Sequence, residues 1–468
     1  MNLASRFEAL LAESCAGAFA QARTRRRAAE LALGALCALG RRTLSRAICA
    51  VGRQGEDWSA DYKLYSRSPW QSEALFDPVL RDYLVRFDEG PICAAMDDTK
   101  LAKRGRRIAT ATWQRDPLSP PFHVNLLRGL RFMQVSLLYP HYRQGDFGAR
   151  GLPVRFGECP VLKKPGKRAT DEQRHAWRQA RKQQNLSRQS LAMIRELRER
   201  LDALGALHRA LLLAVDGSLT NRTIFRERLA GVELVGRCRK DAALCLAAPP
   251  GSRRRYAQET FTPEGVRQAE RVPWHEARVF YGGQRRTVRY KEVPEVLWRR
   301  GAGTRPLRLL VLAPQPYRNS PNGPRQYHDP AYLLATDLKL SAEELIQCYL
   351  DRWQIEVNHR DEKQILGVGQ AQVWSPKSVP RQPAFAVAAY SLLLLAGLQT
   401  LGPGRGEEFI ALPKWRKQAQ RASALDYVSL LRKQLNETRG CGRRPEKMEI
   451  NLVHYAYTQP GRAGTKEE

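Results

Sequence analysis

The chain has 468 residues, enough for two to four domains at roughly 100–200 residues per domain, and its 43% of hydrophobic residues exclude wholesale disorder. Its 78 Lys and Arg residues exceed its 47 Asp and Glu residues, which gives a formal net charge of +31. A charge of this size attracts polyanions, of which nucleic acid is the commonest in a cell, although an acidic lipid surface or a generally basic proteome would also explain it.

Cysteine usage and the apolar segments exclude further classes of protein. The nine cysteines are scattered, odd in number and free of C-x-x-C pairs, which argues against a disulfide framework or a zinc ribbon. The first residues, MNLASRFEAL, lack the basic tip and apolar stretch of a signal peptide. The most apolar stretch, Phe385 to Leu398, is shorter than the ~20 residues that span a bilayer. We therefore expect a soluble, cytoplasmic protein without a membrane partner.

Residues 1–90 are predicted to be helical and to form an N-terminal DNA-binding domain. Ala, Leu and Arg dominate the segment RTRRRAAELALGALCALGRRTLSRAICAVG, and Gly40 divides it into two short helices. A helix–glycine–helix unit with basic ends suits a helix-turn-helix-like DNA module, and generic helical packing explains the pattern nearly as well.

From residue 91 to 245 the pattern changes to strands and helices. The run PICAAMDD predicts a strand that ends at Asp97 and Asp98. Two further strands are expected on either side of a turn near Gly129, over residues 124–127 and 132–139.

The second half of this region is first basic and then apolar. Residues 160–185 are rich in Lys, Arg and Gln and lead into a long helix that ends near Leu204. The run RALLLAVDGS has the length and continuous apolarity of a buried strand, and it ends at Asp216. A short helix and another strand, VELVGRCRKDAAL, follow.

Residues 246–330 are predicted to be a β-rich insertion. The alternating segment EARVFYGGQRRTVRYKEV indicates a hairpin that turns at Gly282-Gly283, and LRLLVLAP predicts another strand. Arginines 253–255 and 285–286 either hold DNA or lie in solvated loops, and we favour DNA. Strand and helix patterns return over 331–400, and 401–468 is expected to be a helical C-terminal region whose tail, GRAGTKEE, is frayed.

A helix that begins at Ser341 carries an unusual polar stripe. Ser341 and Glu344 form a capping box, and the helix is expected to run to Gly367. At about 100° per residue, four of its polar residues share an arc of about 60°; they are Tyr349, Arg352, Glu356 and Lys363. A salt-bridge ladder on a solvated face is the alternative explanation.

Acidic residues at strand ends suggest a metal site. Asp216 follows a buried strand, and Asp97 and Asp98 end another, so that all three carboxylates would be presented at the edge of a sheet. Mg²⁺ prefers oxygen ligands, and two such ions about 4 Å apart would serve phosphoryl transfer. The cations near Glu356 are expected to bind phosphate and to lower the pKa of the acids.

Other chemistry-bearing residues are interpreted as structural. His359 lies about 20° outside the polar arc, and Cys238 and Cys245 suit core packing better than metal binding. Trp353 is predicted to be a core residue, with base stacking as the alternative.

The spacing Y-x2-R-x3-E-x6-K, with RWQIE inside it, resembles the signature of the DDE transposases of bacterial insertion sequences, in the group named after insertion sequence four. The segments MDDTKLAKRG, VDGSLTNRTIF with VGRCRKDA, and LATDLKLSAEELIQCYLDRWQIE are similar to the regions around the family's three acids. DWSADYKLYSRSPW resembles the joint before its catalytic domain, so that the resemblance covers roughly residues 55–400.

The resemblance implies an α/β fold: an RNase H-like core, a mixed sheet with flanking helices, interrupted by the β-rich insertion and preceded by the helical DNA-binding domain. It implies that Asp97, Asp216 and Glu356 are the catalytic, metal-binding triad. Asp98 is the alternate first acid, because a strand can point only one of the pair into the site. Contacts to DNA phosphates would come from Tyr349, Arg352 and Lys363.

The function implied is that of a transposase. It would bind the terminal inverted repeats of its element, cut them by hydrolysis with two Mg²⁺ ions, for which Mn²⁺ can substitute, and join the 3′-OH ends to target DNA. A dimer in the synaptic complex on double-stranded DNA and a nucleoid-associated location in a bacterial cytoplasm follow from the same resemblance. The alternatives are a catalytically inactive or domesticated DNA-binding protein and a metal-dependent endonuclease without strand transfer.

Overall fold

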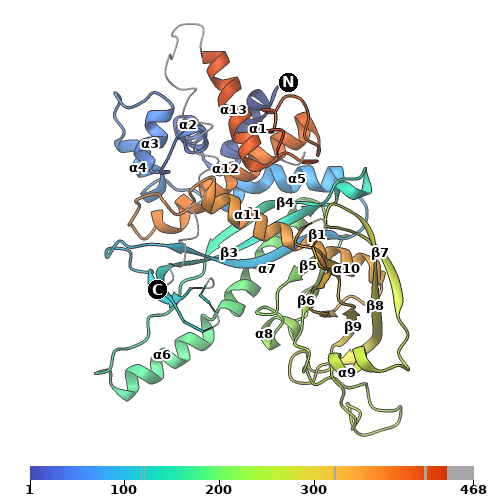
Figure 1. Ribbon diagram of the computed structural model, residues 1–468. Helices are drawn as coiled ribbons and strands as arrows, with labels where there is room; N and C mark the ends of the chain where they lie inside the picture. The colour runs from blue at the N-terminus through green and yellow to red at the C-terminus, as the bar shows by residue number, and fades with distance from the viewer. Residues whose placement is uncertain (117–118, 121, 321–322, 416–418, 440–468) are drawn as a thin grey trace, which may run out of the picture.

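The protein is a mixed α/β structure built on a ten-stranded sheet with helices packed against it (Figure 1). The computed structural model describes residues 1–116, 119–120, 122–320, 323–415 and 419–439. The strands run in the order β2-β3-β1-β5-β6-β12-β9-β8-β7, and β4 also pairs with β3. The strands of this sheet are β1 (Ile92–Ala102), β2 (Thr112–Arg115), β3 (Leu126–Tyr139), β4 (Arg150–Glu158), β5 (Leu211–Val215), β6 (Val232–Arg237), β7 (His275–Tyr281), β8 (Gln284–Leu297), β9 (Pro306–Leu312) and β12 (Ala331–Ala335).

Helices occupy both ends of the chain and the connections between strands. A separate two-stranded ribbon is formed by β10 (Pro316–Tyr317) and β11 (Gln326–Tyr327). The α-helices are α1 (Leu3–Ala18), α2 (Ala22–Cys37), α3 (Leu44–Ala50), α4 (Ser59–Ser66), α5 (Asp77–Arg86), α6 (Asp171–Gln183), α7 (Leu186–Ala203), α8 (Arg222–Phe225), α9 (Pro263–Gln268), α10 (Ala342–Asp351), α11 (Trp353–Gln364), α12 (Ser378–Leu401) and α13 (Ala424–Arg439). Two 3₁₀ turns, Glu73–Phe76 and His141–Arg143, complete the set within the described ranges.

Strand β5 shows why the centre of the sheet is buried on both faces. Leu211, Leu213 and Val215 belong to one hydrophobic cluster, and Leu212 and Ala214 belong to another. Side chains alternate between the two faces of a strand, so these clusters lie on opposite sides of the sheet. The continuous apolar run that predicted this strand is therefore the pattern of a strand covered on both faces.

The helices of residues 1–90 share a core with the C-terminal helices. The predicted pair of short helices is confirmed as α2 and α3, and Gly40 between them has the left-handed φ of 65°. Helix α1 packs against α12 and α13, and their apolar residues belong to the same cluster as one face of the sheet. In Figure 1 these helices form one layer above the sheet. A separate N-terminal domain and the other domain boundaries remain predictions.

The strands of residues 246–330 extend the large sheet. The predicted hairpin is confirmed as β7 and β8, which turn at Gly282 and Gly283 with φ of 63° and 82°. Such left-handed angles are the reason that glycine occupies both positions of the turn. Strand β8 pairs with β9, and β9 pairs with β12, which joins the hairpin to the central strands.

Two predictions about the first strands are wrong. Strand β1 continues to Ala102, so that Asp97 and Asp98 lie within it and not at its end. Strand β3 is continuous across Gly129, where a turn between two strands was expected. A Cβ at Gly129 would lie 2.5 Å from the backbone oxygen of Leu101 on β1, so this glycine permits a close approach of two backbones.

The predicted helix from Ser341 is two helices. The capping box of Ser341 and Glu344 is confirmed, but α10 ends at Asp351 and α11 begins at Trp353. At the junction, the Arg352 N–H donates to the carbonyl of Tyr349 three residues earlier, in place of the usual four. The sequence has no proline or glycine there to predict the break.

Helix α12 is the core helix of the helical layer. By length and composition it could cross a membrane, but 78% of its most apolar window is buried inside the protein, as in a core helix of a soluble protein. It has 24 residues and is longer than the apolar stretch recognised in the sequence. The predicted frayed tail lies outside the described residues.

The close approach at Gly129 predicts a specific loss of stability. In Gly129→Ala the new methyl group meets the β1 backbone, and overpacking of this kind costs about 1–3 kcal/mol. The apparent Tm should fall. Gly55→Ala is the control, since a Cβ there meets nothing within 4 Å and should change stability by no more than about 0.5 kcal/mol. Equal Tm values for the two variants would contradict this account of the strand.

Candidate active site

Asp97 and Asp216 are neighbours on adjacent parallel strands. Strands β1 and β5 pair in parallel up to Met96 and Val215; Asp97 is the next residue of β1, and Asp216 is the first residue after β5. Neighbouring strands lie about 4.8 Å apart, and residues in register point to the same face. Because Ala95 and Ala214 belong to the cluster under α10 and α11, alternation turns both aspartates toward these helices.

Asp216 also shapes the turn that follows β5. Its Oδ1 accepts hydrogen bonds from the N–H of Ser218 at 3.0 Å, from the Ser218 hydroxyl at 2.7 Å and from the N–H of Leu219 at 3.2 Å. These bonds fix the orientation of the carboxylate. Asp216 therefore has two roles: it stabilises the turn after β5, and its carboxylate lies beside Asp97.

Arg352 connects the sheet to the glutamate of α11. Its Nη1 lies 3.7 Å from Oδ2 of Asp97, and its Nη2 donates to Oε1 of Glu356 at 3.0 Å. The Arg352 guanidinium carbon also lies 5.9 Å from the centre of the Tyr349 ring. The structure thus brings together Tyr349, Arg352 and Glu356 with Asp97, and through the strand register with Asp216.

Asp98 has a different partner. Its Oδ2 lies 3.0 Å from Nε of Arg131 on β3. By alternation it points to the face opposite Asp97, with Ala94 and Met96. Asp97 is therefore the aspartate that faces the Glu356 helix, and its assignment as the first acid stays a prediction that this geometry favours.

The pKa of Asp97 is raised to about 7. Burial is the larger cause, the repulsion of Asp216 adds to it, and Arg352 acts in the opposite direction. Burial also raises the pKa of Asp98, against the influence of Arg131. The nearby cations do act to lower the pKa of both acids, as expected, but desolvation outweighs their attraction and the net pKa of each is raised.

Lys363, the last residue of the predicted stripe, lies at the exposed end of α11. Partial desolvation lowers its pKa, and the carboxylates of Asp97 and Asp98 act in the opposite direction. The lysine is therefore within electrostatic reach of the acids while its side chain stays accessible to a ligand.

A buried polar network beneath α11 was not predicted. The Ser136 hydroxyl donates to Oδ1 of Asn358 at 2.9 Å, Nε2 of Gln134 donates to Ser136 at 3.1 Å, and Asn358 donates to the carbonyl of Gly151 at 3.0 Å. Gln134 is the cross-strand partner of Asp97. The network fixes α11 on β3 and β4 and so sets the height of Glu356 above the sheet. On α11 the network involves Asn358, a polar residue on the buried side of the helix.

The predictions for the other chemistry-bearing residues have different outcomes. Trp353 is 60% exposed, so the prediction that it belongs to the core is wrong. His359 is buried, and burial lowers its pKa to about 3, which agrees with a structural role. Cys238 and Cys245 are buried, as predicted.

The donor chemistry fits a divalent cation, although the side chains do not yet form a closed metal site. Within the described ranges, no three His, Cys, Asp or Glu side chains stand close enough together to hold a metal ion. The carboxylate of Asp216 nevertheless repels that of Asp97, which is largely buried, and the guanidinium of Arg352 lies 3.7 Å from Asp97. Hard carboxylate oxygens are the ligands that Mg²⁺ prefers.

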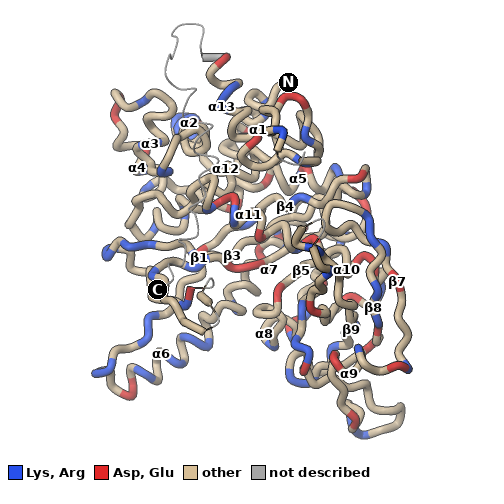
Figure 2. The backbone as a smooth tube through the Cα atoms, in the orientation of Figure 1, with Lys and Arg blue, Asp and Glu red and all other residues tan. Residues whose placement is uncertain are grey.

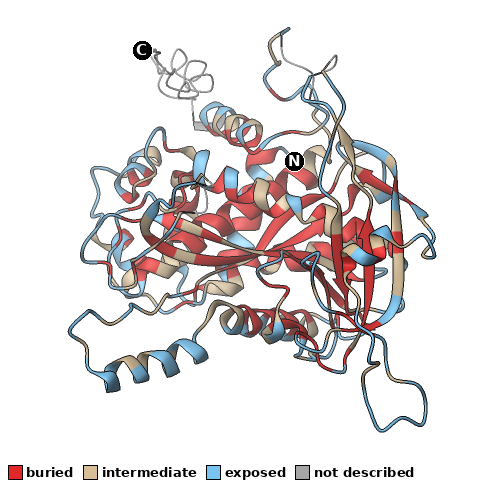
Figure 3. Ribbon diagram, turned by 60° about the horizontal axis from the view of Figure 1, so that its bottom comes forward, coloured by how far each residue is buried: buried red, intermediate tan, exposed pale blue. Residues whose placement is uncertain are grey.

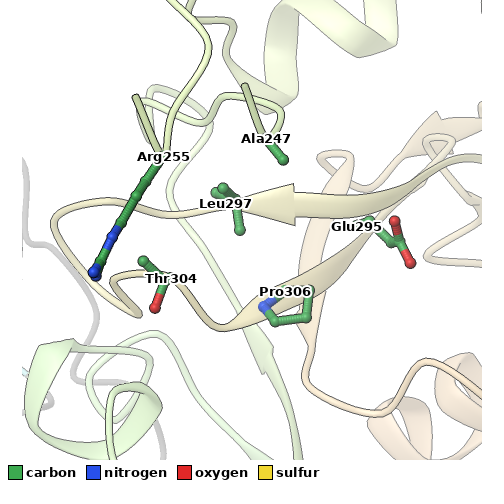
Figure 4. A pocket seen from close by; sticks show the side chains of 6 residues that line it. All are labelled: Ala247, Arg255, Glu295, Leu297, Thr304 and Pro306. Carbon is green, nitrogen blue, oxygen red and sulfur yellow. The ribbon is translucent and has the colours of Figure 1, made fainter. Parts of the chain in front are cut away.

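A cavity of about 430 Å³ lies in the β-rich region, away from these acids (Figure 4). It is lined by Ala247, Arg255, Glu295, Leu297, Thr304 and Pro306. It contains none of the predicted site residues.

The chain matches no model of a known protein family, and no curated protein matches it. A function for the chain therefore has to be inferred from the site itself.

The raised pKa of Asp97 predicts a pH-dependent stability. The folded protein holds this proton more tightly than the unfolded chain, so the carboxyl reduces stability as pH rises from about 4 to about 7. Asp97→Asn removes this cost. At one pKa unit per 1.36 kcal/mol the gain at pH 8 is about 4 kcal/mol at most, and relaxation should reduce it to about 1–2 kcal/mol.

Thermal unfolding in the presence of a metal chelator measures this effect. The Tm difference between Asp97→Asn and wild type should be small at pH 4 and positive at pH 8. Asp241→Asn, at an exposed position, is the control and should show no such change with pH. An Asp97→Asn protein that is less stable than wild type at pH 8 would refute the predicted repulsion.

Proposed function

We propose that this protein is a DDE transposase with an RNase H-like core. The observation that carries the proposal is the meeting of Asp97 and Asp216 on adjacent parallel strands, beneath a helix whose Glu356 is joined to Asp97 through Arg352. A large mixed sheet flanked by helices is compatible with that core. The net charge of +31 supports DNA as the partner.

In this proposal Asp97, Asp216 and Glu356 hold Mg²⁺ as two ions, for which Mn²⁺ can substitute. Bound Mg²⁺ would lower the pKa of the attacking water and stabilise the leaving oxygen. The protein's own residues position the DNA: Arg352 offers a planar fork to a phosphate, and Lys363 offers a point charge. Arg352 is held near the carboxylates in the DNA-free protein, so DNA and metal would exchange its partners from carboxylate to phosphate.

The assembly and location follow from the same proposal. Each element end needs one active site and synapsis joins two ends, so a dimer on double-stranded DNA is the working unit. The DNA would be the terminal inverted repeats of an element and a target, in the nucleoid of a bacterial cytoplasm. All three candidate acids are present, two of them side by side and the third connected to Asp97 through Arg352, which supports an enzyme over an inactive DNA-binding protein.

Glu356→Gln should abolish catalysis and leave binding intact. We expect Mg²⁺-dependent nicking of element ends to fall by roughly 100-fold or more, because loss of a metal ligand removes several kcal/mol of transition-state stabilisation. Glu199→Gln, on the exposed side of α7, is the matched control and should nick at the wild-type rate. Full activity in Glu356→Gln would sink the assignment. Joining of pre-cut ends separates a transposase from a simple endonuclease.

Metal binding can be measured without catalysis. A ligand that binds only the folded protein stabilises it by about 2.7 kcal/mol at 100 times its Kd. We expect Mg²⁺ alone to raise the Tm of the wild-type protein at pH 7 and to have little effect on an Asp97→Asn, Asp216→Asn double variant. Equal shifts in both proteins would show that these carboxylates do not hold the ion.

A further inference from the structure

Helix α6 projects from the body of the protein. It covers 13 residues, Asp171–Gln183, and none of them is buried. Figure 3 shows it as an exposed helix that stands away from the sheet and the other helices. A surface helix normally buries one apolar face against a core. The order of this helix therefore has to come from local interactions, and its whole surface is open to a partner.

Local interactions account for the helix. Thr170 and Gln173 form a complete capping box, two acidic residues lie in the first turn, and two basic residues lie in the last, where each complements the helix dipole. Arg174 donates to the carbonyls of Lys167 at 2.8 Å and Ala169 at 3.2 Å, which ties the helix to the segment before it. A helix of this length is marginal alone in water, so these contacts are what keep it formed.

The outer surface of α6 is strongly basic. Residues 160–185, which contain the helix and the segment before it, hold eight Lys or Arg residues and two acidic residues. Figure 2 shows the basic positions along the helix and the segment before it. The side chains of Arg178, Arg181 and Lys182 are exposed, and no carboxylate in the described part of the chain pairs with them. Arg181 lies 5.3 Å from the Trp177 ring, which holds it over the helix.

The base of this segment lies close to Asp98, on the face of the sheet opposite to Asp97. The N–H of Cys159, the residue after β4, donates to the carbonyl of Arg131 at 2.8 Å. The side chain of that same Arg131 pairs with Asp98, next to Asp97 on β1. A 13-residue helix is about 20 Å long, and a turn of DNA is about 34 Å. The arm therefore starts beside β3, on the side of the sheet to which Asp98 points, and its helix is long enough to reach more than half a turn along a duplex.

We propose that residues 160–185 form an arm that holds the phosphate backbone of duplex DNA on the side of the molecule where β4 ends beside β3. Exposed cations that pair with no carboxylate in the described part of the chain, on a helix with no buried residue, complement a polyanion. Contacts to phosphates do not distinguish one base sequence from another. The arm would therefore add affinity for any duplex and orient it on the protein. The position of the bound DNA next to a scissile phosphate rests on the proposed function, and binding of a duplex by the arm does not.

The salt dependence of DNA binding tests the arm. The variant is Arg178→Gln, Arg181→Gln, Lys182→Gln, which changes no buried residue. The control is Lys240→Gln, Arg271→Gln, Arg300→Gln, which removes the same charge from exposed positions in the region of α9, on the other side of the molecule in Figure 1. Each lost phosphate contact reduces the slope of log K against log salt by about 0.9. We expect the arm variant to lose about 2–3 from the slope and the control to keep the wild-type slope.

Three results decide the outcome for a non-specific duplex of about 40 base pairs and for vesicles of anionic lipid. A reduced slope in the arm variant alone supports the proposal. The same slope in the arm variant and the wild type overturns it, as does a loss of binding to vesicles with DNA binding unchanged, because the partner would then be a membrane. Circular dichroism should show that both variants stay folded.

Nicking separates this inference from the proposed function. On duplexes that extend beyond the cleavage site, the arm variant should need about tenfold more DNA for half-maximal nicking and keep its maximal rate. On duplexes cut short next to that site, it should equal the wild type. If the wild-type protein shows the arm-dependent slope but never nicks DNA, the proposed function fails and the arm stands. If it nicks DNA with an arm-independent slope, the arm fails and the function stands.

Discussion

The rest of the site depends on the parallel pairing of β1 with β5. That register places Asp97 beside Asp216 under the face of the sheet that α10 and α11 cover, and burial shields the carboxyl of Asp97 from water. Burial and repulsion raise the pKa of Asp97, and the guanidinium of Arg352 relieves only part of the cost. Two neighbouring carboxylates with one of them buried reduce the stability of the protein, and a bound cation or a complex with a polyanion would offset this cost. The proposed chemistry depends on that compensation.

The helix above these acids is positioned by its own buried contacts. Asp351 ends α10 and accepts hydrogen bonds from Tyr142 at 2.8 Å and Gln347 at 3.0 Å, which fixes the chain just before the break at Arg352. On the other side of the break, Asn358 is bonded to the backbone of β4 and to Ser136 of β3. Arg352 is thus held between two anchored helices, which limits where its guanidinium can reach. The distance between Glu356 and the sheet is a property of this packing and not of the helix alone.

The positive charge of the chain has more than one role in this structure. Some cations form ion pairs within the fold: Arg131 and Arg352 are paired with the carboxylates of Asp98 and Asp97. Others, such as Arg178, Arg181 and Lys182 of α6, are exposed and pair with no carboxylate in the described part of the chain. The total of +31 indicates a polyanion but does not distinguish these two groups. Desolvation also reverses the simple expectation that many cations must lower the pKa of the acids among them.

Local signals in the sequence determined the elements, and the tertiary structure decided how they meet. The capping box at Ser341 and the Gly282-Gly283 turn depend on bonds within a few residues, so the sequence predicts them correctly. The sequence wrongly predicted a turn at Gly129. A glycine is needed there because the backbone of β1, which is distant in the sequence, lies close to it. The i,i+4 spacing of Arg352 and Glu356 allowed for their ion pair, which the sequence offered as the alternative explanation of the polar stripe. The register that brings Asp97 beside its partner acid, and the burial that raises its pKa, were decided only by the fold, because both depend on which chain segments exclude water from it.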